Sequence, residues 1–151
     1  MKKLFYIIVI AVVLGLIFGF KPAGTEIAII VNKENPVASL SSSEAKLYWL
    51  RKIKKRWPEL NKNIKPVDRK GKCAEQDAYY SKVLGMSASD VENYFTQKQY
   101  ESAEKPQDKF ANDAAIIDFV AGEPGAIGFV NVAYLNAEAK SKVKVVLTIN
   151  D

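Results

Sequence analysis

The chemically most suggestive part of the chain is a short basic turn that precedes a helical pattern. It contains three cations, a glycine and the first residues of that pattern: Arg69, Lys70, Gly71, Lys72, Cys73 and Ala74. Cationic side chains beside a helix N-terminus supply positive charge and N–H donors, which suit an oxyanion. The alternative is a solvated turn, because water and salt screen exposed charges. The residues alone leave both interpretations open.

Two other places have the position expected of a ligand site. In an open α/β sheet, ligands bind beyond the carboxyl ends of strands, where helix N-termini present free N–H groups. Asn32 and Lys33 follow the first predicted strand, and Gly125 lies in a Pro-Gly turn. The predicted ligand is phosphate or another small oxyanion, held weakly by a set of residues drawn from all three places: Asn32, Lys33, Arg69, Lys70, Gly71, Lys72, Cys73, Ala74 and Gly125.

Residues for acid-base, nucleophilic or metal chemistry are scarce. Cys73 is the single cysteine, so the chain has no internal disulfide. A helix start and nearby lysines could lower the pKa of Cys73, whereas the other interpretation is a half-buried, inert thiol. There is no histidine, and Asp113, Asp118 and Glu123 show no spacing that pairs them. We therefore expect no enzyme, no catalytic residue, no metal and no cofactor.

The N-terminus has the pattern of an export signal. Lys2 and Lys3 precede an unbroken apolar run over residues 4–20, which is typical of a secretory signal peptide or a short membrane anchor. Both alternatives place the rest of the chain outside the cytoplasm, in the periplasm or an equivalent extracytoplasmic space. Residues 1–21 are thus the predicted signal or anchor, and residues 22–151 the predicted domain.

Charge is distributed unevenly along that domain. Residues 46–72 hold eleven Lys or Arg against two acids, whereas residues 73–151 hold seven against twelve. We expect one basic region, and the densest part of it is the segment 51–57. This segment could face an anionic membrane surface, although Trp57 within it is predicted to be core. An exported protein seldom meets nucleic acid, so no nucleic-acid partner is expected.

Local patterns predict alternating strands and helices. Mostly apolar segments predict strands over 26–32, 126–130 and 143–149, and residues 64–68 are a further strand candidate. Capping-box patterns at Ser41 and Ser87 predict helix starts, and Gly85 is placed to end the helix between them. Further helical segments are expected over 112–121 and 132–135, with a loop over 100–109. This order predicts an α/β fold, a three-layer sandwich with a mixed, mostly parallel sheet.

The turn before the third predicted strand is rich in residues that constrain the backbone. Gly122 is placed at the end of a helix, and Pro124 prevents the helix from continuing. Gly125 and Gly128 allow backbone angles or close approaches that a side chain would block. We therefore expect backbone geometry to be important at this turn.

In order and spacing, several segments resemble the substrate-binding proteins of phosphate ABC transporters. The resemblance covers roughly residues 25–149 and rests on five segments: 27–32, 39–41, Arg56-Trp57-Pro58, 66–69 and 124–130. It implies one lobe of the two-lobed periplasmic binding protein fold. In that family the turn after the second strand carries an arginine and hydroxyl side chains that bind phosphate. Arg69 and Gly71 match that turn, whereas Lys72, Cys73 and Ala74 stand where the hydroxyl donors would be.

Two functions of different classes remain. The first is an exported, non-enzymatic domain related to phosphate-binding proteins, with a degenerate anion loop that a second copy or an envelope partner would cover. The second is an interaction module that has lost ligand binding and docks an envelope protein or the membrane with its cleft-facing surface. The basic segment 51–57 would steer this docking and could itself face a membrane surface.

Overall fold

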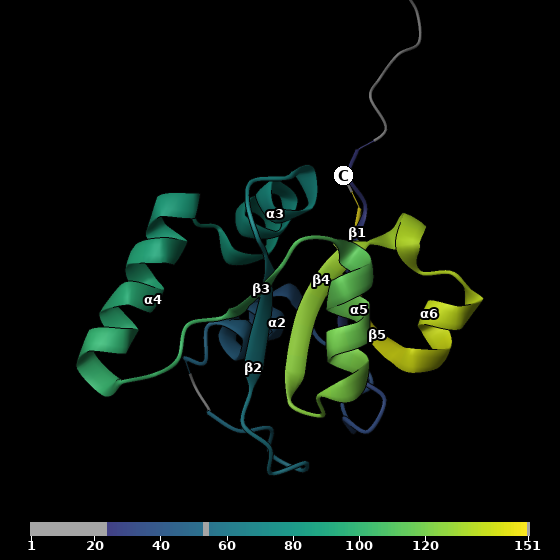
Figure 1. Ribbon diagram of the computed structural model, residues 1–151, viewed down its shortest axis with the longest axis horizontal. Helices are drawn as coiled ribbons and strands as arrows, with labels where there is room; N and C mark the ends of the chain where they lie inside the picture. Colours follow the sequence, from purple (N-terminus) through teal and green to yellow (C-terminus); the bar gives the residue numbers. More distant parts are fainter. Residues whose placement is uncertain (1–23, 53–54, 151) are drawn as a thin grey trace, which may run out of the picture.

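A computed structural model describes residues 24–52 and 55–150, which form one five-stranded sheet covered by helices on both faces (Figure 1). Its elements are β1 (Ile27–Asn32), α2 (Ser42–Trp49), β2 (Lys65–Arg69), α3 (Ala74–Ala78), the π-helix η1 (Tyr79–Leu84), α4 (Ala88–Ser102), β3 (Asp108–Phe110), α5 (Asp113–Gly122), β4 (Ala126–Asn131), the 3₁₀-helix η2 (Val132–Tyr134), α6 (Ala137–Lys142) and β5 (Val143–Ile149). The predicted signal or anchor lies outside the described residues. Within these residues, we find no helix that combines the length and apolar character needed to cross a bilayer.

The direction of β1 decides which loops lie together. The strand order is β3-β2-β4-β1-β5, in which β2 pairs in parallel with β3 and β4. In contrast, β1 pairs antiparallel with both β4 and β5. Four strands therefore run one way, and the predicted mixed, mostly parallel sheet is confirmed. A consequence is that the carboxyl end of β1 lies at the amino ends of β2 and β4.

The sheet separates two apolar cores, because alternate residues of a strand point to opposite faces. Ile29 of β1 belongs to the core that contains Trp49 of α2 and Phe129 of β4. The next residue, Ile30, belongs to the second core together with Ile116 of α5. In Figure 1, α5 lies in front of the sheet and α2 behind it, which gives the three predicted layers.

The predicted helix boundaries depend on local hydrogen bonds. Ser41 and Ser87 each form a complete capping box, with Glu44 and Asp90 as the respective partners. Gly85 ends η1 in the left-handed conformation, with φ +60°. Side chains three residues apart supply these caps, so the sequence alone was sufficient to predict them.

Close backbone contact defines the turn that leads into β4. A Cβ atom on Gly125 would lie 2.0 Å from the carbonyl oxygen of Asn63, so only glycine fits there without a shift. The buried indole of Trp57 donates a hydrogen bond to the Gly125 oxygen at 2.9 Å, which confirms that Trp57 is core. A Cβ on Gly128 would lie 3.1 Å from Ile116, so glycine lets α5 pack closely on the sheet.

Two elements were missed by the sequence patterns, and two others differ from their predicted extent or form. The strand β3 lies in the segment predicted as a loop, and α4 extends three residues beyond its predicted end near Gln99. The short helix α6 and the π-helical form of η1 were also not expected. Segments of three to six residues carry too little periodicity to be recognised before their packing partners are known.

Candidate functional site

The predicted anion loop lies at the carboxyl end of β2. Arg69 is the last residue of the strand, and Lys70, Gly71 and Lys72 are exposed after it. Gly71 has φ +99°, a conformation that favours glycine, and the Lys70 N–H donates to the Phe110 oxygen at 2.7 Å. The backbone therefore holds this turn firmly, and both lysine side chains face solvent.

Arg69 already contacts an oxyanion group of the protein itself. Its guanidinium Nη1 forms an ion pair with Oδ1 of Asp113, the first residue of α5. The Arg69 side chain is 14% exposed and that of Asp113 only 1%. The second Asp113 oxygen, Oδ2, accepts the backbone N–H of Asn131 at 3.2 Å. An arginine and a backbone amide thus bind one carboxylate at the carboxyl edge of the sheet.

Burial affects the protonation of Asp113. Removal from water raises its pKa above the ordinary value, and the Asn131 N–H and the charge of Arg69 offset only part of this effect. The carboxylate therefore takes up a proton at a less acidic pH than a free aspartate. Protonation would weaken the attraction that keeps Arg69 paired.

A second buried carboxylate, Asp68, lies one residue before the arginine. Its Oδ2 accepts the Tyr80 hydroxyl at 2.6 Å and the Gln107 amide at 3.4 Å, and its Oδ1 accepts the Gln76 amide at 3.1 Å. Burial, followed by the charge of Asp68, raises the pKa of Tyr80, which keeps this hydroxyl protonated as a donor. No local sequence pattern indicates this network, because its members come from three separate segments of the chain.

Cys73 precedes α3 and is partly buried, and its side chain makes no capping hydrogen bond. Burial raises the pKa of its thiol, with a further contribution from Glu75, and the charge of Arg69 offsets only part. The prediction of a half-buried cysteine is confirmed. The backbone N–H of Gln76 at the helix start does act to lower the thiol pKa, but the net pKa is raised and not lowered. Desolvation is larger here than the favourable charges.

Glu75 joins the loop to β4. Its carboxylate accepts the Asn131 side-chain amide at 3.2 Å. Burial acts to raise the pKa of Glu75, but hydrogen bonds, including those from Asn131 and Cys73, hold it below the ordinary value. Asn131 therefore contacts Asp113 through its backbone and Glu75 through its side chain. Three carboxylates, of Asp68, Glu75 and Asp113, accompany the cations at this edge.

The other predicted ligand residues lie at the opposite edge of the sheet. Asn32 is buried, and its amide donates to the carbonyl oxygens of Val120 and Ala121 at 2.8 and 2.9 Å, which ties β1 to the last turn of α5. Lys33 is exposed beside it. Gly125 precedes β4, and its oxygen accepts hydrogen bonds within the turn. The antiparallel direction of β1 separates Asn32 and Lys33 from the loop 69–74. Gly125 is separated from it because it precedes β4, which runs parallel to β2.

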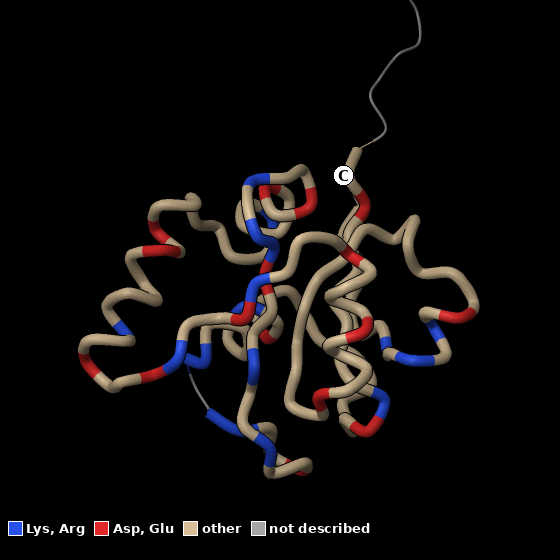
Figure 2. The backbone as a smooth tube through the Cα atoms, in the orientation of Figure 1, with Lys and Arg blue, Asp and Glu red and all other residues tan. Residues whose placement is uncertain are grey.

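The basic segment 51–57 also lies away from that loop. The Ile64 N–H donates to the Lys55 oxygen at 2.9 Å, so the segment flanks the amino end of β2. Figure 2 shows Lys and Arg along the lower part of the molecule as well as on the turn after β2. The prediction of one basic region is therefore wrong. The cations that precede β2 in the sequence lie near its amino end, and those that follow it lie at its carboxyl end.

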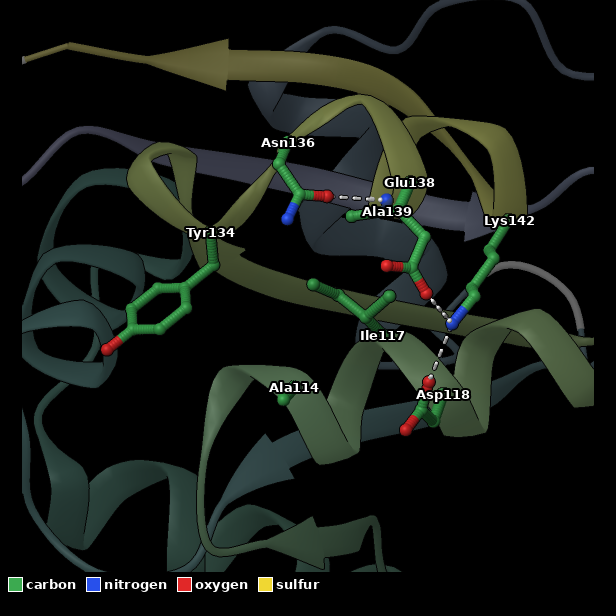
Figure 3. Close-up of a pocket in the computed structure, with 8 residues that line it drawn as sticks. All are labelled: Ala114, Ile117, Asp118, Tyr134, Asn136, Glu138, Ala139 and Lys142. Carbon is green, nitrogen blue, oxygen red and sulfur yellow. Dashed lines mark hydrogen bonds and ion pairs between the residues drawn. The ribbon is translucent and has the colours of Figure 1, made fainter.

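Four cavities of 170 to 290 Å³ lie outside the loop 69–74. The largest lies between α5 and α6, and Figure 3 shows its residues. At one side of it, Lys142 contacts Glu138 at 2.9 Å and Asp118 at 3.6 Å, and Tyr134 lies at the other side with 57% of its surface exposed. The lysine is used to join the two helices, so this cavity offers little free charge.

Metal binding has no visible basis in residues 24–52 and 55–150. No group of three or more His, Cys, Asp or Glu side chains is placed there to hold an ion. The carboxylates of the loop region have other partners: an arginine, a tyrosine hydroxyl and amides.

The sequence matches no model of a known protein family, and no curated protein matches it. Solved structures do match. One is a protein from Clostridium perfringens assigned as a phosphate ABC transporter substrate-binding protein, with bound phosphate (TM-score 0.63, 24% identity). Others are an ABC-type phosphate transport receptor from Vibrio cholerae (TM-score 0.62, 19% identity) and PstS from Borrelia burgdorferi (TM-score 0.60, 11% identity).

The similarity extends over most of this chain but over less than half of each matched structure. Each match includes 82% of this chain but only 45%, 46% and 48% of the respective structures. The chain thus has the fold of one lobe of these binding proteins and spans less than half of their length. The predicted fold is confirmed, whereas a shared fold at this identity does not by itself transfer a ligand.

Proposed function

We propose that the chain is an exported, non-enzymatic domain that binds phosphate or a similar small oxyanion weakly at the carboxyl end of β2. The observation that carries this proposal is the contact of Arg69 with Asp113. An arginine and a backbone N–H already bind the two oxygens of one carboxylate there. An arginine fork is suited to any planar or tetrahedral oxyanion, so an external anion can compete for the same donors.

The same contact explains why binding should be weak. An external anion has to displace the Asp113 carboxylate, which is fixed next to the arginine and acts as an intramolecular competitor. Lys70 and Lys72 lie on the adjacent turn and are exposed, so they add attraction that salt screens. The charges of Asp68 and Glu75 oppose it. We therefore expect a dissociation constant of about 1 mM or weaker at low salt, equivalent to roughly 4 kcal/mol or less.

A partner would strengthen the site by covering it. The chain has the fold of one lobe, and the solved structures that share this fold are about twice as long. A second copy or another envelope protein over the loop 69–74 would exclude water and increase the strength of every charge interaction there. The apolar run 4–20 is the basis for proposing export.

The chemistry of the side chains favours binding over catalysis. The sequence has no histidine, and burial keeps the Cys73 thiol above its ordinary pKa, which makes it a poor nucleophile at neutral pH. The structures with the same fold are described as transport proteins.

The interaction module predicted for the segment 51–57 has less support. Trp57 is fully buried, and Arg51 is mostly buried and lies against Glu104. Only Lys52, Lys55 and Arg56 are exposed among the described residues of the segment. These observations favour the oxyanion proposal over docking through this segment.

Calorimetric titration of phosphate into the full-length chain at low salt tests the proposal. Asp113→Asn should bind phosphate more tightly than the unmodified chain, because it removes the internal competitor and keeps a neutral polar group. The double variant Arg69→Ala/Asp113→Asn should lose binding without leaving a buried charge unpaired. Lys140→Ala, an exposed lysine on α6, serves as the control. Equal affinity of the single and double variants would contradict the proposal.

A further inference from the structure

Two adjoining cavities lie at the amino end of β2, at the edge of the sheet opposite the loop 69–74. Their volumes are about 250 and 240 Å³, and they share Arg51, Lys65 and Lys105. Each alone is slightly smaller than the roughly 300–1,000 Å³ of typical small-molecule sites, but together they fall within that range. Three shared cations make this region the most positive hollow among the cavities described.

The cations around Glu104 show that the local potential is positive. Burial of this carboxylate acts to raise its pKa, but a hydrogen bond from Lys55 and the charges of Arg51 and Lys98 hold the pKa below its ordinary value. The Lys55 contact measures 2.8 Å. The region therefore stabilises a negative group even where burial opposes it.

The protein leaves part of its cationic capacity unused. The Arg51 side chain is 12% exposed, and its Nη2 donates to the Lys105 oxygen at 2.7 Å. Its Nε is buried, 3.7 Å from Glu104, and has no hydrogen-bond partner. Lys105 itself is exposed, and its side chain forms no hydrogen bond or ion pair with another residue that the structure describes. A buried guanidinium N–H without a hydrogen-bond partner costs free energy. Arg51 therefore keeps an unsatisfied donor, whereas Arg69 is paired with Asp113.

One wall of the first cavity is apolar. Pro66, Pro106 and Phe119 line it together with the three cations and Asp108, and the Phe119 ring packs against Phe110 with ring centroids 4.8 Å apart. Apolar side chains and cations that line the same cavity match a ligand that carries both negative charge and a ring. Inorganic phosphate would use the cations and leave this wall in contact with water.

We propose that the two cavities form one site for a small organic phosphate, a phosphate monoester with an apolar or aromatic ring. Its phosphate contacts Arg51 and Lys105, and Lys65, which is paired with Glu123 at 2.6 Å, adds positive charge beside them. Its ring packs against the wall formed by Pro66, Pro106 and Phe119. This site is separate from the oxyanion site at Arg69 and does not depend on it.

A recessed site favours a soluble ligand over a lipid headgroup. A bilayer presents its phosphates on a broad surface, where they would meet the exposed Lys52, Lys55 and Arg56 rather than the cavities. A soluble monoester can enter the hollow and contact both the cations and the apolar wall. A soluble monoester and a lipid headgroup both present a phosphate, and an experiment can distinguish which of them binds here.

The test is a titration of phenyl phosphate into the full-length chain, followed by amide chemical shifts in nuclear magnetic resonance spectra. We expect saturable shifts around residues 65, 105 and 119 and an affinity at least about fivefold higher than that of inorganic phosphate at this site. Lys105→Glu should weaken phenyl phosphate binding about tenfold or more, because it replaces a cation with a negative charge that repels the phosphate. Lys140→Glu makes the same charge change on α6 and should have little effect.

Three results would overturn the proposal. The first is no saturation up to 10 mM phenyl phosphate, and the second is shifts confined to the loop 69–74. The third is binding to vesicles of phosphatidylglycerol and phosphatidylcholine without binding of phenyl phosphate, which would assign the cations to a membrane surface. Asp113→Asn should leave phenyl phosphate affinity at residues 65, 105 and 119 unchanged, so failure here is distinguishable from failure of the oxyanion proposal.

Discussion

The two ends of β2 use similar residues in opposite ways. At the carboxyl end, Arg69 is paired with the buried Asp113, and the neighbouring Asp68 has four hydrogen-bond donors around it. At the amino end, Arg51 keeps one N–H without a partner, and Lys105 is exposed beside two cavities. A cation indicates a ligand site only when the protein leaves it available. The loop 69–74, which the sequence singles out as the anion site, has more of its charged groups paired within the protein than the amino end of β2 has.

Removal of Arg69 should have the largest effect on the carboxyl end. Arg69→Ala leaves the Asp113 carboxylate buried without its cation, which we expect to cost about 3–5 kcal/mol of unfolding free energy. Chemical denaturation measures this loss. Arg69→Ala/Asp113→Asn removes both charges and should recover most of it. If the single and double variants were equally unstable, the ion pair would not be the cause.

The next largest effect should come from Gly125, which lies near the amino end of β2. Gly125→Ala places a Cβ 2.0 Å from the Asn63 oxygen, so the backbone has to move and the Trp57 hydrogen bond is strained. We expect a loss of about 2–3 kcal/mol in denaturation experiments. Gly122→Ala is the matched control, because a Cβ there meets nothing within 4 Å. Equal stability of the two variants would contradict the close contact.

Competition between Asp113 and an external anion should be visible in affinity. Asp113→Asn is expected to strengthen phosphate binding about tenfold, equivalent to roughly 1.4 kcal/mol, since the internal carboxylate no longer occupies Arg69. Calorimetry at low salt measures the change. Asp118→Asn, on the exposed side of α5, is the control and should change the affinity by less than about twofold. A weaker affinity in Asp113→Asn would show that the carboxylate is part of the anion site instead of its competitor.

The pH should change both the stability of the protein and its affinity for phosphate through Asp113 at the carboxyl end of β2. Because the pKa of Asp113 is raised in the folded state, the folded protein binds this proton more tightly than the unfolded chain. The contribution of Asp113 to stability is therefore greatest below its ordinary pKa, and part of it is lost as the pH rises through the raised value. Over the same window, acidification should strengthen phosphate binding at Arg69. Asp113→Asn should remove both dependences, and persistence of either in this variant would assign it to another group.

The smallest effect should come from the ion pair of Lys55 and Glu104. The lysine side chain is 68% exposed, so Lys55→Ala should change the unfolding free energy by about 0.5 kcal/mol or less. Thermal denaturation at low and high salt measures it, and the difference should vanish at high salt. A loss above about 1 kcal/mol would indicate that the amino end depends on its own internal pairing as the carboxyl end does.

Much of the fold could be predicted because its signals are local. The capping boxes at Ser41 and Ser87 involve residues three positions apart, and the strands β1, β4 and β5 are short, largely apolar runs between turns. Trp57 was correctly assigned to the core. In contrast, β3 has three residues and forms only because it can pair with β2, so its own sequence carries almost no signal.

The candidate site was less predictable because its parts are far apart in the chain. Arg69 was identified, but its partner Asp113 lies 44 residues away, and no spacing rule connects them. Asn32, Lys33 and Gly125 were grouped with Arg69 on the assumption that all three places follow parallel strands. The reversed direction of β1 puts Asn32 and Lys33 at the other edge, and Gly125 lies there because it precedes a strand and does not follow one.

The sequence by itself determined the alternation of strands and helices, the composition of the two apolar faces and the supply of cations around β2. These properties depend on hydrophobic period and on short-range hydrogen bonds, which neighbouring residues fix before the chain is compact. The tertiary structure alone decided which cations were neutralised and which were left beside a cavity. That choice depends on where distant carboxylates and apolar walls come to lie, and only the closed sheet and its packed helices bring them together.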